Sequence, residues 1–583
     1  MRLRSEDLFR AEVRIPSGAG ETLRFASAEL CHYLQAMSRV PLAPVRDPSL
    51  VRPGVVVGRA PLPETGPLEE GEFRVVPSAS GFCVLGGSER AVLHGVYRLL
   101  EHWGCRWSFH GSPLEEIPRL TAEGVAVPEL REKPAFRVRA YASDIHTWHY
   151  SEPEKLRSRL PSDVAFVDWL GKTGANAFLF IHHPFDSAFT IRELEPEFSK
   201  RGIGIEWGGH VLPVLLPRER FRDHPEWFPE GPDGRRTDLG NLCPSSPEAL
   251  AEVADRAWKL ATANPRLGAL HLWGADFWEG GWCRCAGCKG LSPSEQSLRV
   301  CNAVARRLEE RGFPHSIYAL AYHDTIEPEL ESAPAERVFC EFAPRERCYA
   351  HALSDPSCER NRFYRRALEG YLRIFGPRVR VFEYYGDAIL FFGCGVPLVE
   401  VIEEDLEFYR TAGVSEVSLL QFGAYSVWAY PLNLLAYAFG TWGRSGELGR
   451  SIPRELRAYG PQFWRRFEQA VRPAVAHGDI RRPTGADPKR LAEQLSTASR
   501  ELAELSRAVP DPDSSEQREL LGYTAAVLRC VAKELEGSAP RPVVEDELGK
   551  AISRLAALAP RHVGLWGVFD LPLVHAFFAS RKE

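Results

Sequence analysis

The stretch LGALHLWGADFWEGGWCRCAGCKG, from Leu267 to Gly290, joins an apolar run, an acidic residue and three closely spaced cysteines. The run from Leu267 to Leu272 predicts a short buried strand, which ends just before Trp273 and Asp276. Barrel enzymes carry their catalytic groups at the carboxyl ends of parallel strands. The stretch therefore predicts a hydrolytic active site, beside a loop whose cysteines have the spacing of metal ligands.

Seven more strand-like runs accompany this one, with helical patterns between most of them. Near-continuous apolar character suits strands that are buried on both faces. The eight runs are Arg137 to Asp144, Ala177 to His182, Gly202 to Trp207, Ala269 to Trp273, Ser316 to Tyr322, Arg337 to Phe342, Val379 to Tyr385 and Glu416 to Phe422. Eight such units over about 290 residues match a (β/α)8 TIM barrel, predicted at residues 133–430. The alternative is an open, doubly wound sheet, but no G-x-G-x-x-G follows the first run.

The regions on either side of the predicted barrel have different patterns. Residues 1–132 alternate short apolar runs with two amphipathic helical stretches, which predicts an N-terminal α/β domain. Residues 431–583 show long helical periodicity rich in Ala, Leu, Arg and Glu, which predicts a C-terminal helical region. The expected fold class is therefore α/β, with the barrel between two smaller units.

The composition of the chain limits which binding partners and which cellular compartment are expected. The net charge is −6 over 583 residues, without a polybasic run, so nucleic acid is not expected as a partner. The N-terminus MRLRSEDLFRAEVRIP carries charges where a secretory leader needs an apolar core, and no run reaches the roughly 18 apolar residues of a membrane span. The 13 cysteines, an odd number, fit reduced thiols. We expect a cytoplasmic chain with no membrane partner, and the sequence allows a homodimer.

Polar and aromatic side chains follow most of the predicted strands. Because the carboxyl ends of parallel strands meet at one mouth of a barrel, these side chains can converge there. Any one of them is more often a surface charge or a buried structural group, but together they favour a binding site. Aromatic faces stack on sugar rings while carboxylates and histidines bind hydroxyl groups, so we expect a carbohydrate. The candidates are His182, His210, Trp273, Tyr322, Tyr384 and Tyr385 for binding, and Asp276, Glu341 and Glu383 for catalysis.

Several motifs resemble known glycosidases. GGSERAVLHGVYRLLEHWGCRWSFHG, Gly86 to Gly111, and the upstream FASAELCHYLQAMSRVPLAPV are similar to the α/β domain that precedes the barrel in α-glucuronidases and β-N-acetylhexosaminidases. GGH, ending at His210, and HLWGAD, ending at Asp276, resemble the hexosaminidase pair P-G-H and H-x-G-G-D-E. NLCPSSPE, CRCAGC and YALAYHDT resemble a bacterial family of uncharacterised proteins built on the same plan.

The resemblance implies a role for Asp276. In H-x-G-G-D-E the final Glu is the general acid, and the Asp before it orients the acetamido group of the substrate. Without a gap, Asp276 takes the acid position and Ala275 the orienting position, so substrate-assisted catalysis lacks its usual carboxylate. Glycosidic cleavage generally needs a second carboxylate, for which Glu383 and Glu341 are the candidates.

The cysteine motif predicts a metal site of its own. Cys283, Cys285 and Cys288 supply three sulfur ligands, whereas a tetrahedral zinc site needs four. Cys243 is the best fourth ligand, because its loop enters the same end of the barrel. A closed four-cysteine site is structural, so we expect structural zinc and no organic cofactor. Three reduced thiols in a loop, or a catalytic metal, are the alternatives.

The function expected from these residues is an exo-acting glycoside hydrolase. The resemblance implies a terminal N-acetylhexosaminide, such as a β-N-acetylgalactosaminide or β-N-acetylglucosaminide, on an oligosaccharide or glycoside. The alternatives are an α-glucuronidase-like uronide hydrolase and a non-catalytic glycan-binding relative. For the enzyme we expect a buried Asp276 with a raised pKa at the base of a pocket, about 5 to 10 Å from a second carboxylate.

Overall fold

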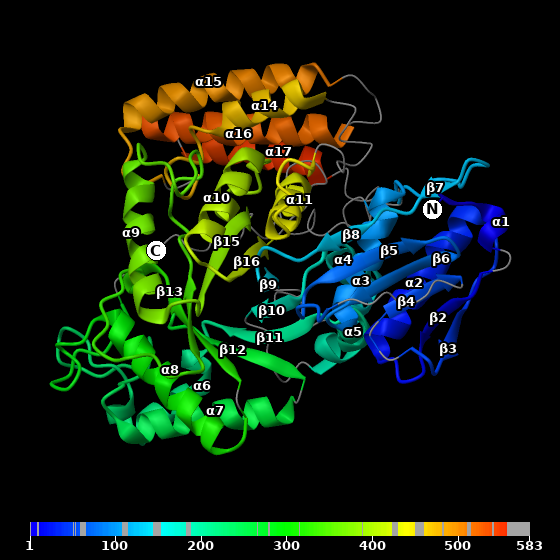
Figure 1. Ribbon diagram of the computed structural model, residues 1–583. Helices are drawn as coiled ribbons and strands as arrows, with labels where there is room; N and C mark the ends of the chain where they lie inside the picture. Colours follow the sequence, from blue (N-terminus) through cyan, green and yellow to red (C-terminus); the bar gives the residue numbers. More distant parts are fainter. Residues whose placement is uncertain are drawn as a thin grey trace.

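The computed structural model (Figure 1) describes most of the chain. The described residues are 2–8, 11–50, 52, 54–58, 66–107, 115–143, 153–181, 188–264, 266–277, 280–313, 315–387, 389–422, 430–448, 460–480, 483–509, 515–538 and 541–556.

A closed barrel of eight parallel strands forms the centre of the molecule. Its strands are β9 (Val138–Ser143), β10 (Ala177–Ile181), β11 (Gly204–Gly209), β12 (Leu267–Leu272), β13 (Ser316–Ala321), β14 (Val338–Phe342), β15 (Val379–Asp387) and β16 (Glu416–Phe422). They neighbour one another in chain order, and β16 closes the ring by pairing with β9. Each strand coincides with one of the eight predicted runs to within a few residues. The predicted barrel is confirmed, and the open sheet is wrong.

Helices follow most of these strands and cover the outside of the barrel. They are α4 (Pro153–Thr173), α5 (Ala188–Lys200), α7 (Pro247–Ala263), α8 (Pro293–Glu310), α9 (Glu359–Phe375), α10 (Val399–Thr411) and α11 (Tyr430–Thr441). Two begin at Ser-Pro pairs, where Ser246 and Ser292 accept from the backbone N–H of Ala249 and Glu295. Serine satisfies an otherwise unpaired N–H at the helix start, and proline suits the first turn.

A mixed sheet of six strands, mostly antiparallel, precedes the barrel. Its order is β3-β2-β4-β6-β5-β8, from β2 (Val13–Pro16), β3 (Pro44–Asp47), β4 (Gly54–Gly58), β5 (Phe73–Ser78), β6 (Gly81–Gly86) and β8 (Leu130–Glu132). The helices α2 (Glu21–Ser38) and α3 (Glu89–His102) share a hydrophobic core with this sheet. Figure 1 shows this unit beside the barrel.

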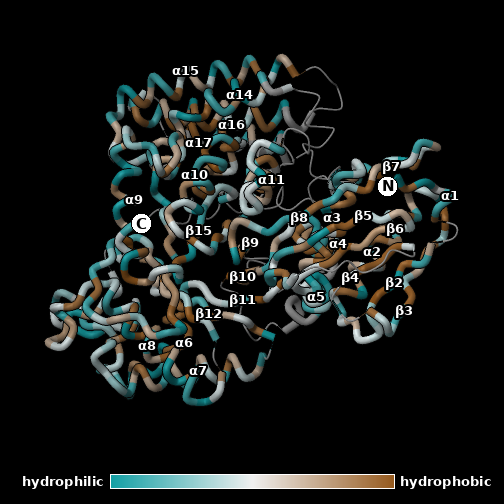
Figure 2. Tube along the Cα trace, in the orientation of Figure 1, coloured by the Kyte–Doolittle hydropathy of each residue, from teal (hydrophilic) through white to brown (hydrophobic). Residues whose placement is uncertain are grey.

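Long helices form a separate layer after the barrel: α14 (Gly460–Val471), α15 (Pro488–Arg507), α16 (Ser515–Glu536) and α17 (Arg541–Ala556). In Figure 2 the α15 tube alternates between teal and brown, as expected of a helix with one apolar face. Tyr523 of α16 donates to the carbonyl of Phe392 at 2.7 Å, which joins this layer to the loop after β15. None of the described helices has the length and apolar character to cross a bilayer.

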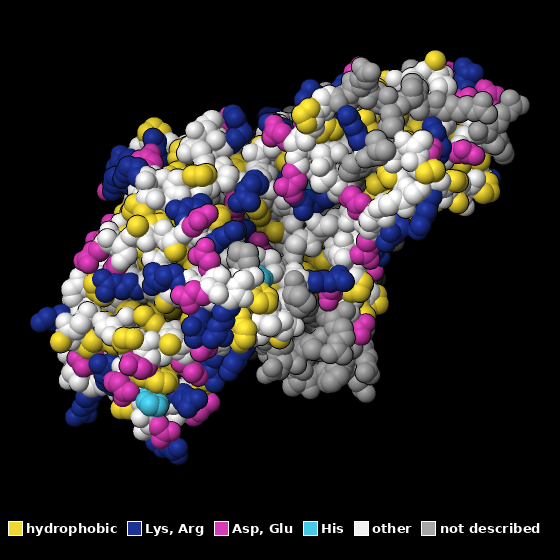
Figure 3. Space-filling model, turned by 60° about the horizontal axis from the view of Figure 1, so that its bottom comes forward, with side chains coloured by type: hydrophobic (Ala, Val, Ile, Leu, Met, Phe, Trp, Pro, Cys, Tyr) yellow, Lys and Arg dark blue, Asp and Glu magenta, His cyan; other side chains and the backbone are white. Residues whose placement is uncertain are grey.

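The helix α11 belongs with the barrel rather than with the C-terminal layer. The hydroxyl of Tyr437 donates to the carbonyl of Ala140 in β9 at 2.9 Å, and Asn433 donates to the carbonyl of Tyr385 in β15 at 2.9 Å. We therefore propose three units near the predicted bounds 1–132, 133–430 and 431–583, with the last boundary moved beyond α11. Figure 3 shows acidic and basic side chains intermixed over the visible face of the molecule.

Candidate active site

Side chains from four successive strand ends meet at the carboxyl mouth of the barrel. His210 follows β11, Asp276 follows β12, His323 follows β13 and Glu346 follows β14. The Nε2 atoms of His210 and His323 each lie 3.9 Å from Oδ1 of Asp276. On its other side, Nδ1 of His323 lies 3.3 Å from Oε2 of Glu346. The imidazole of His323 therefore lies between two carboxylates.

Two backbone features hold these histidines in place. A side chain at Gly208 would put its Cβ 2.0 Å from the carbonyl oxygen of His271, so only glycine lets β11 approach β12 here. The resulting turn brings Nδ1 of His210 to 2.5 Å from the carbonyl oxygen of Gly274. His323 has a φ of 46°, a left-handed conformation that is uncommon for residues other than glycine. Such conformations concentrate at functional sites.

Asp276 lies at the rim of the mouth. Its side chain is 43% exposed, so our expectation of a buried carboxyl at the base of a pocket is wrong. The strand ends before this residue, and the loop carries it outward. Burial lowers the pKa of His210, and the nearby Asp276 carboxylate only partly opposes that shift. His210 is therefore neutral at physiological pH and can donate a single hydrogen.

Arg345 and Glu346 are candidate site residues that the sequence reasoning missed. Arg345 Nε lies 3.2 Å from Asp387 Oδ2, and its Nη1 lies 3.5 Å from Glu346 Oε1. Burial raises the pKa of Glu346, but His323 and Arg345 lower it further, so the net pKa is below the usual value. Glu346 is thus an ionised carboxylate at the mouth. The run R-E-R, two residues after the end of the predicted sixth strand, was the signal that could have identified it.

The aromatic candidates converge on the same mouth, with one exception. The ring of His210 lies 5.4 Å from Trp273 and 6.0 Å from Tyr322, measured between centroids. Trp273 lies 5.6 Å from Phe382, which in turn lies 5.2 Å from Tyr384. The exception is Tyr385, described below with Glu383. His182 lies outside the described residues.

Glu383 and Tyr385 do not face the mouth, so their predicted roles there are wrong. Successive residues of a strand point to opposite faces. On β15, Arg380, Phe382 and Tyr384 face the barrel interior, which leaves Glu383 and Tyr385 facing α10. Tyr409 of α10 donates to Glu383, and Tyr385 donates to Asp405 of α10 at 2.8 Å. Burial raises the pKa of Glu383 to about 7.

Glu341 faces the barrel interior, but it lies beneath the mouth rather than in it. The carboxylate is fully buried and accepts from Trp273 Nε1 at 3.1 Å, and one of its oxygens lies 2.6 Å from Nδ1 of His271. Since no part of Glu341 is open to solvent or substrate, its predicted catalytic role is wrong. It orients Trp273 instead.

Below that layer the barrel interior is charged rather than apolar. His271 Nε2 lies 3.0 Å from Glu206 Oε2, and Arg380 donates to Glu206 and Glu416 at 3.0 Å each. Burial lowers the pKa of His271, but Glu341 and Glu206 raise it more, so the net pKa lies above the usual value. The imidazole of His271 therefore lies between two buried carboxylates that favour its protonated form.

Two cavities adjoin the mouth. A small one is lined by His210, Tyr322 and His323, and a larger one of about 860 Å³ lies beside it. Phe277, Trp282 and Asp324 line both. The larger cavity runs along the loop that carries the cysteines, and Phe277, whose residue surface is 46% exposed, stands at the junction.

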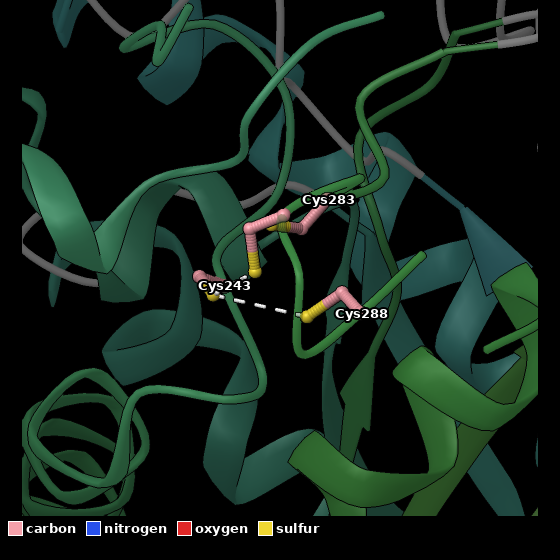
Figure 4. A group of neighbouring side chains, drawn as sticks. Cys243, Cys283 and Cys288 are labelled. Atoms are coloured by element: carbon pink, nitrogen blue, oxygen red, sulfur yellow. Dashed lines mark hydrogen bonds between the residues drawn. The ribbon is translucent and has the colours of Figure 1, made fainter. Parts of the chain in front are cut away.

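The four predicted cysteines come together next to this cavity. Cys243 lies on the loop between β11 and α7, whereas Cys283, Cys285 and Cys288 lie on the loop between β12 and α8. Their sulfurs lie within 4.8 Å of one another and are buried, and Cys243 Sγ is 3.7 Å from Cys285 Sγ and 3.8 Å from Cys288 Sγ. Figure 4 shows the labelled side chains pointing toward a common centre. Four sulfurs about 2.3 Å from one zinc ion would have this separation.

The neighbouring cysteine side chains change the pKa of the Cys243 thiol. Hydrogen bonds from Cys283 and Cys288 lower the pKa of the Cys243 thiol below its usual value. The thiolate is the form that binds metal. The four-cysteine cluster thus has the ligands and spacing of a closed zinc site, and it would tie the loop that carries Asp276 to the loop between β11 and α7.

The protein is thus a closed parallel barrel with carboxylates, histidines and aromatic rings at its carboxyl mouth. The chain belongs to the family described as "Domain of unknown function (DUF4838)", whose model matches residues 109–422. No curated protein matches the sequence significantly.

Solved structures of glycoside hydrolases share the fold. A family GH138 enzyme targeting pectin rhamnogalacturonan II matches with a TM-score of 0.57 and 10% identity, over 94% of this chain and 91% of that one. A family GH115 4-O-methyl-α-glucuronidase with specificity for decorated arabinogalactans matches with a TM-score of 0.52 and 12% identity, over 96% and 77%. A family 89 glycoside hydrolase from Clostridium perfringens matches with a TM-score of 0.51 and 10% identity, over 96% and 67%. At these identities the likeness shows the fold.

Proposed function

We propose that this protein is a glycoside hydrolase that cleaves a terminal sugar at the carboxyl mouth of its barrel. The observation that carries the proposal is the row Asp276, His323, Glu346, in which an imidazole separates two carboxylates of different environment. Glycosidic cleavage needs one carboxyl group that gives a proton and one that stays ionised. The fold shared with several glycoside hydrolases supports the same class.

Asp276 takes the role of general acid. It is open to solvent without substrate, and a sugar ring stacked on the mouth would cover it. Removing water from a carboxyl group favours its neutral, protonated form. The neutral His210 beside it adds no positive charge that would oppose protonation. Asp276 then gives its proton to the glycosidic oxygen as the bond breaks.

Glu346 takes the role of the second carboxylate, in place of Glu383 and Glu341. His323 and Arg345 keep it ionised, so it can stabilise the positive charge that develops on the sugar or activate a water molecule. The large cavity beside Phe277 would hold the rest of an oligosaccharide substrate.

The substrate that the motif resemblance favours is a terminal N-acetylhexosaminide. One observation favours a uronide instead: Arg345 supplies a guanidinium at the mouth, and arginine binds sugar carboxylates in a bidentate manner. Turnover of chromogenic N-acetylhexosaminides and glucuronides distinguishes the two. Binding of these sugars without turnover by the wild-type protein would instead identify a glycan-binding protein and contradict the proposed activity.

We also propose that the four-cysteine cluster holds structural zinc. With all four positions taken by sulfur, the ion has no open site for water and supplies no chemistry. It would keep the loop that carries Asp276 attached to the loop between β11 and α7.

A further inference from the structure

A second group of metal-binding side chains lies on the segment between β14 and α9. The ligand atoms of Cys348, His351 and Cys358 lie within 4.8 Å of one another, and Cys348 Sγ is 3.2 Å from His351 Nδ1. None of these residues belongs to the mouth or to the four-cysteine cluster. Cys348 and His351 are separated by only two residues, so both side chains can reach a single ion.

Cys358 packs against the hydrophobic core but does not cap the helix that it begins. It occupies the N-cap position of α9, where Ser, Thr, Asp or Asn normally accepts a backbone hydrogen bond, yet its side chain makes no capping bond. Cys348 is held from both sides by Asn361: its N–H donates to Asn361 Oδ1 at 2.9 Å, and its carbonyl accepts from Nδ2 at 3.0 Å. The segment is therefore pinned with Cys348 and His351 facing Cys358.

The cluster opens onto a cavity of about 700 Å³. Cys348, His351 and Cys358 all line it, and His477 lines it from the C-terminal part of the chain. Cys348 is buried, Cys358 is half-buried and His351 is exposed, so one side of the cluster faces the cavity.

We propose that Cys348, His351 and Cys358 bind a zinc ion whose fourth position faces this cavity. Two thiolates and one imidazole are soft and borderline ligands that suit zinc rather than magnesium or calcium. A set of two cysteines and one histidine leaves one coordination position for water or another ligand, unlike the closed four-cysteine set. The ion is therefore exchangeable from the cavity side.

This site would also brace the loop that carries Glu346. Glu346 precedes Cys348 by two residues, and its carbonyl accepts a hydrogen bond from Arg360 of α9. A metal that joins Cys348 to Cys358 would attach the same loop to the start of α9. The proposed zinc site does not depend on glycosidase activity.

The test is the zinc content per chain of protein purified without chelator under reducing conditions. His351→Ala removes an exposed ligand, so the variant should fold, and Cys358→Ser removes a second ligand. Each should lose one equivalent of zinc relative to wild type, whereas Cys31→Ala, a buried cysteine of α2, should keep the wild-type content. Cys285→Ser should lose a different equivalent, so that His351→Ala combined with Cys285→Ser loses both.

A second measurement needs no variant. Zinc should protect Cys348 and Cys358 of the wild-type protein from alkylation, and a chelator should expose both together. Folded His351→Ala protein with an unchanged zinc content would overturn the proposal. So would a Cys348–Cys358 disulfide, seen as a mass two hydrogens lower in protein that contains no second zinc.

Discussion

His323 Nδ1 lies 3.3 Å from Glu346 Oε2, while the opposite nitrogen of the same ring faces Asp276. This relationship joins the ends of β12, β13 and β14 into one unit. The imidazole therefore lies in contact range of both carboxylates at once. The two carboxylates that we propose for cleavage are therefore linked through a residue with a left-handed backbone conformation.

Asp276→Asn should reduce turnover of natural glycosides by about 10²- to 10⁴-fold, the usual contribution of general acid catalysis. The amide keeps the shape but has no proton to give. Activated aryl glycosides, whose leaving group needs little protonation, should lose less. Asp546→Asn, at an exposed aspartate of α17 outside the mouth, serves as the matched control. Wild-type turnover of a natural glycoside by Asp276→Asn would show that another group is the acid.

Glu346→Gln and Glu383→Gln separate the two carboxylates that compete for the second role. Glu346→Gln removes the ionised group at the mouth, so kcat should fall by about 10²-fold or more. Glu383→Gln changes a group enclosed between β15 and α10, so the melting temperature should change while kcat stays near that of wild type. The reverse pattern would restore Glu383 as the catalytic residue.

Cys285→Ser should lower the thermal stability of the protein but leave its catalytic rate nearly unchanged. It breaks the four-sulfur set, so zinc should be lost and the melting temperature should fall by about 5 °C or more. Below the melting transition, kcat should remain near the wild-type value, because the site has no open position. Zinc analysis, thermal unfolding and glycoside turnover on one preparation check this. Zinc-free wild-type protein with unchanged stability would argue against a structural ion.

The raised pKa of His271 predicts how stability depends on pH. A histidine whose pKa is higher in the folded state adds stability that is complete below its unfolded pKa of about 6.5. That contribution is lost as pH rises through the folded pKa, because the imidazolium between Glu206 and Glu341 then loses its proton.

His271→Gln therefore should lower the free energy of unfolding most at pH 6 and less at alkaline pH. Breaking such a buried arrangement typically costs about 3–5 kcal/mol. Denaturant unfolding of wild type and variant across this pH range measures the difference. His224→Gln, at an exposed histidine, is the control. A difference that does not change with pH would mean that His271 is not charged in the folded protein.

Phe277→Ala tests the large cavity as the binding site for the rest of the substrate. Loss of one stacking ring at its junction with the mouth should raise KM for an oligosaccharide about fivefold. A small aryl glycoside does not reach this cavity, so its KM should stay unchanged. Equal effects on both substrates would place Phe277 at the terminal sugar instead.

The barrel was predictable because its strands are local apolar runs in a fixed order. Three of the four cysteines were predictable too, since C-x-C-x-x-C spacing brings three ligands together without help from the rest of the fold. Cys243 followed from the prediction that its loop enters the same end of the barrel. His210, Trp273, Tyr322 and Tyr384 followed from the rule that strand ends share a mouth.

The orientation of β15 was not predictable in this way. All nine of its residues are buried, so no alternation of polar and apolar side chains shows which of them face the interior. Glu383 and Tyr384 are neighbours in the same buried strand, and the sequence does not tell their directions apart. In the structure Glu383 faces α10 and Tyr384 faces the mouth. Glu346 was missed for a related reason, because a loop residue gains its position from packing rather than from a repeating pattern.

The amino-acid sequence alone determined the eight strands, their order and the metal-ligand motif, because each depends on neighbours along the chain. Only the tertiary structure decided which carboxylates meet. Asp276 and Glu346 are 70 positions apart, and it is the parallel pairing of β12, β13 and β14, together with the turn at His323, that brings them to one imidazole. Side-chain direction and loop placement follow from packing across the whole barrel, which no local pattern encodes.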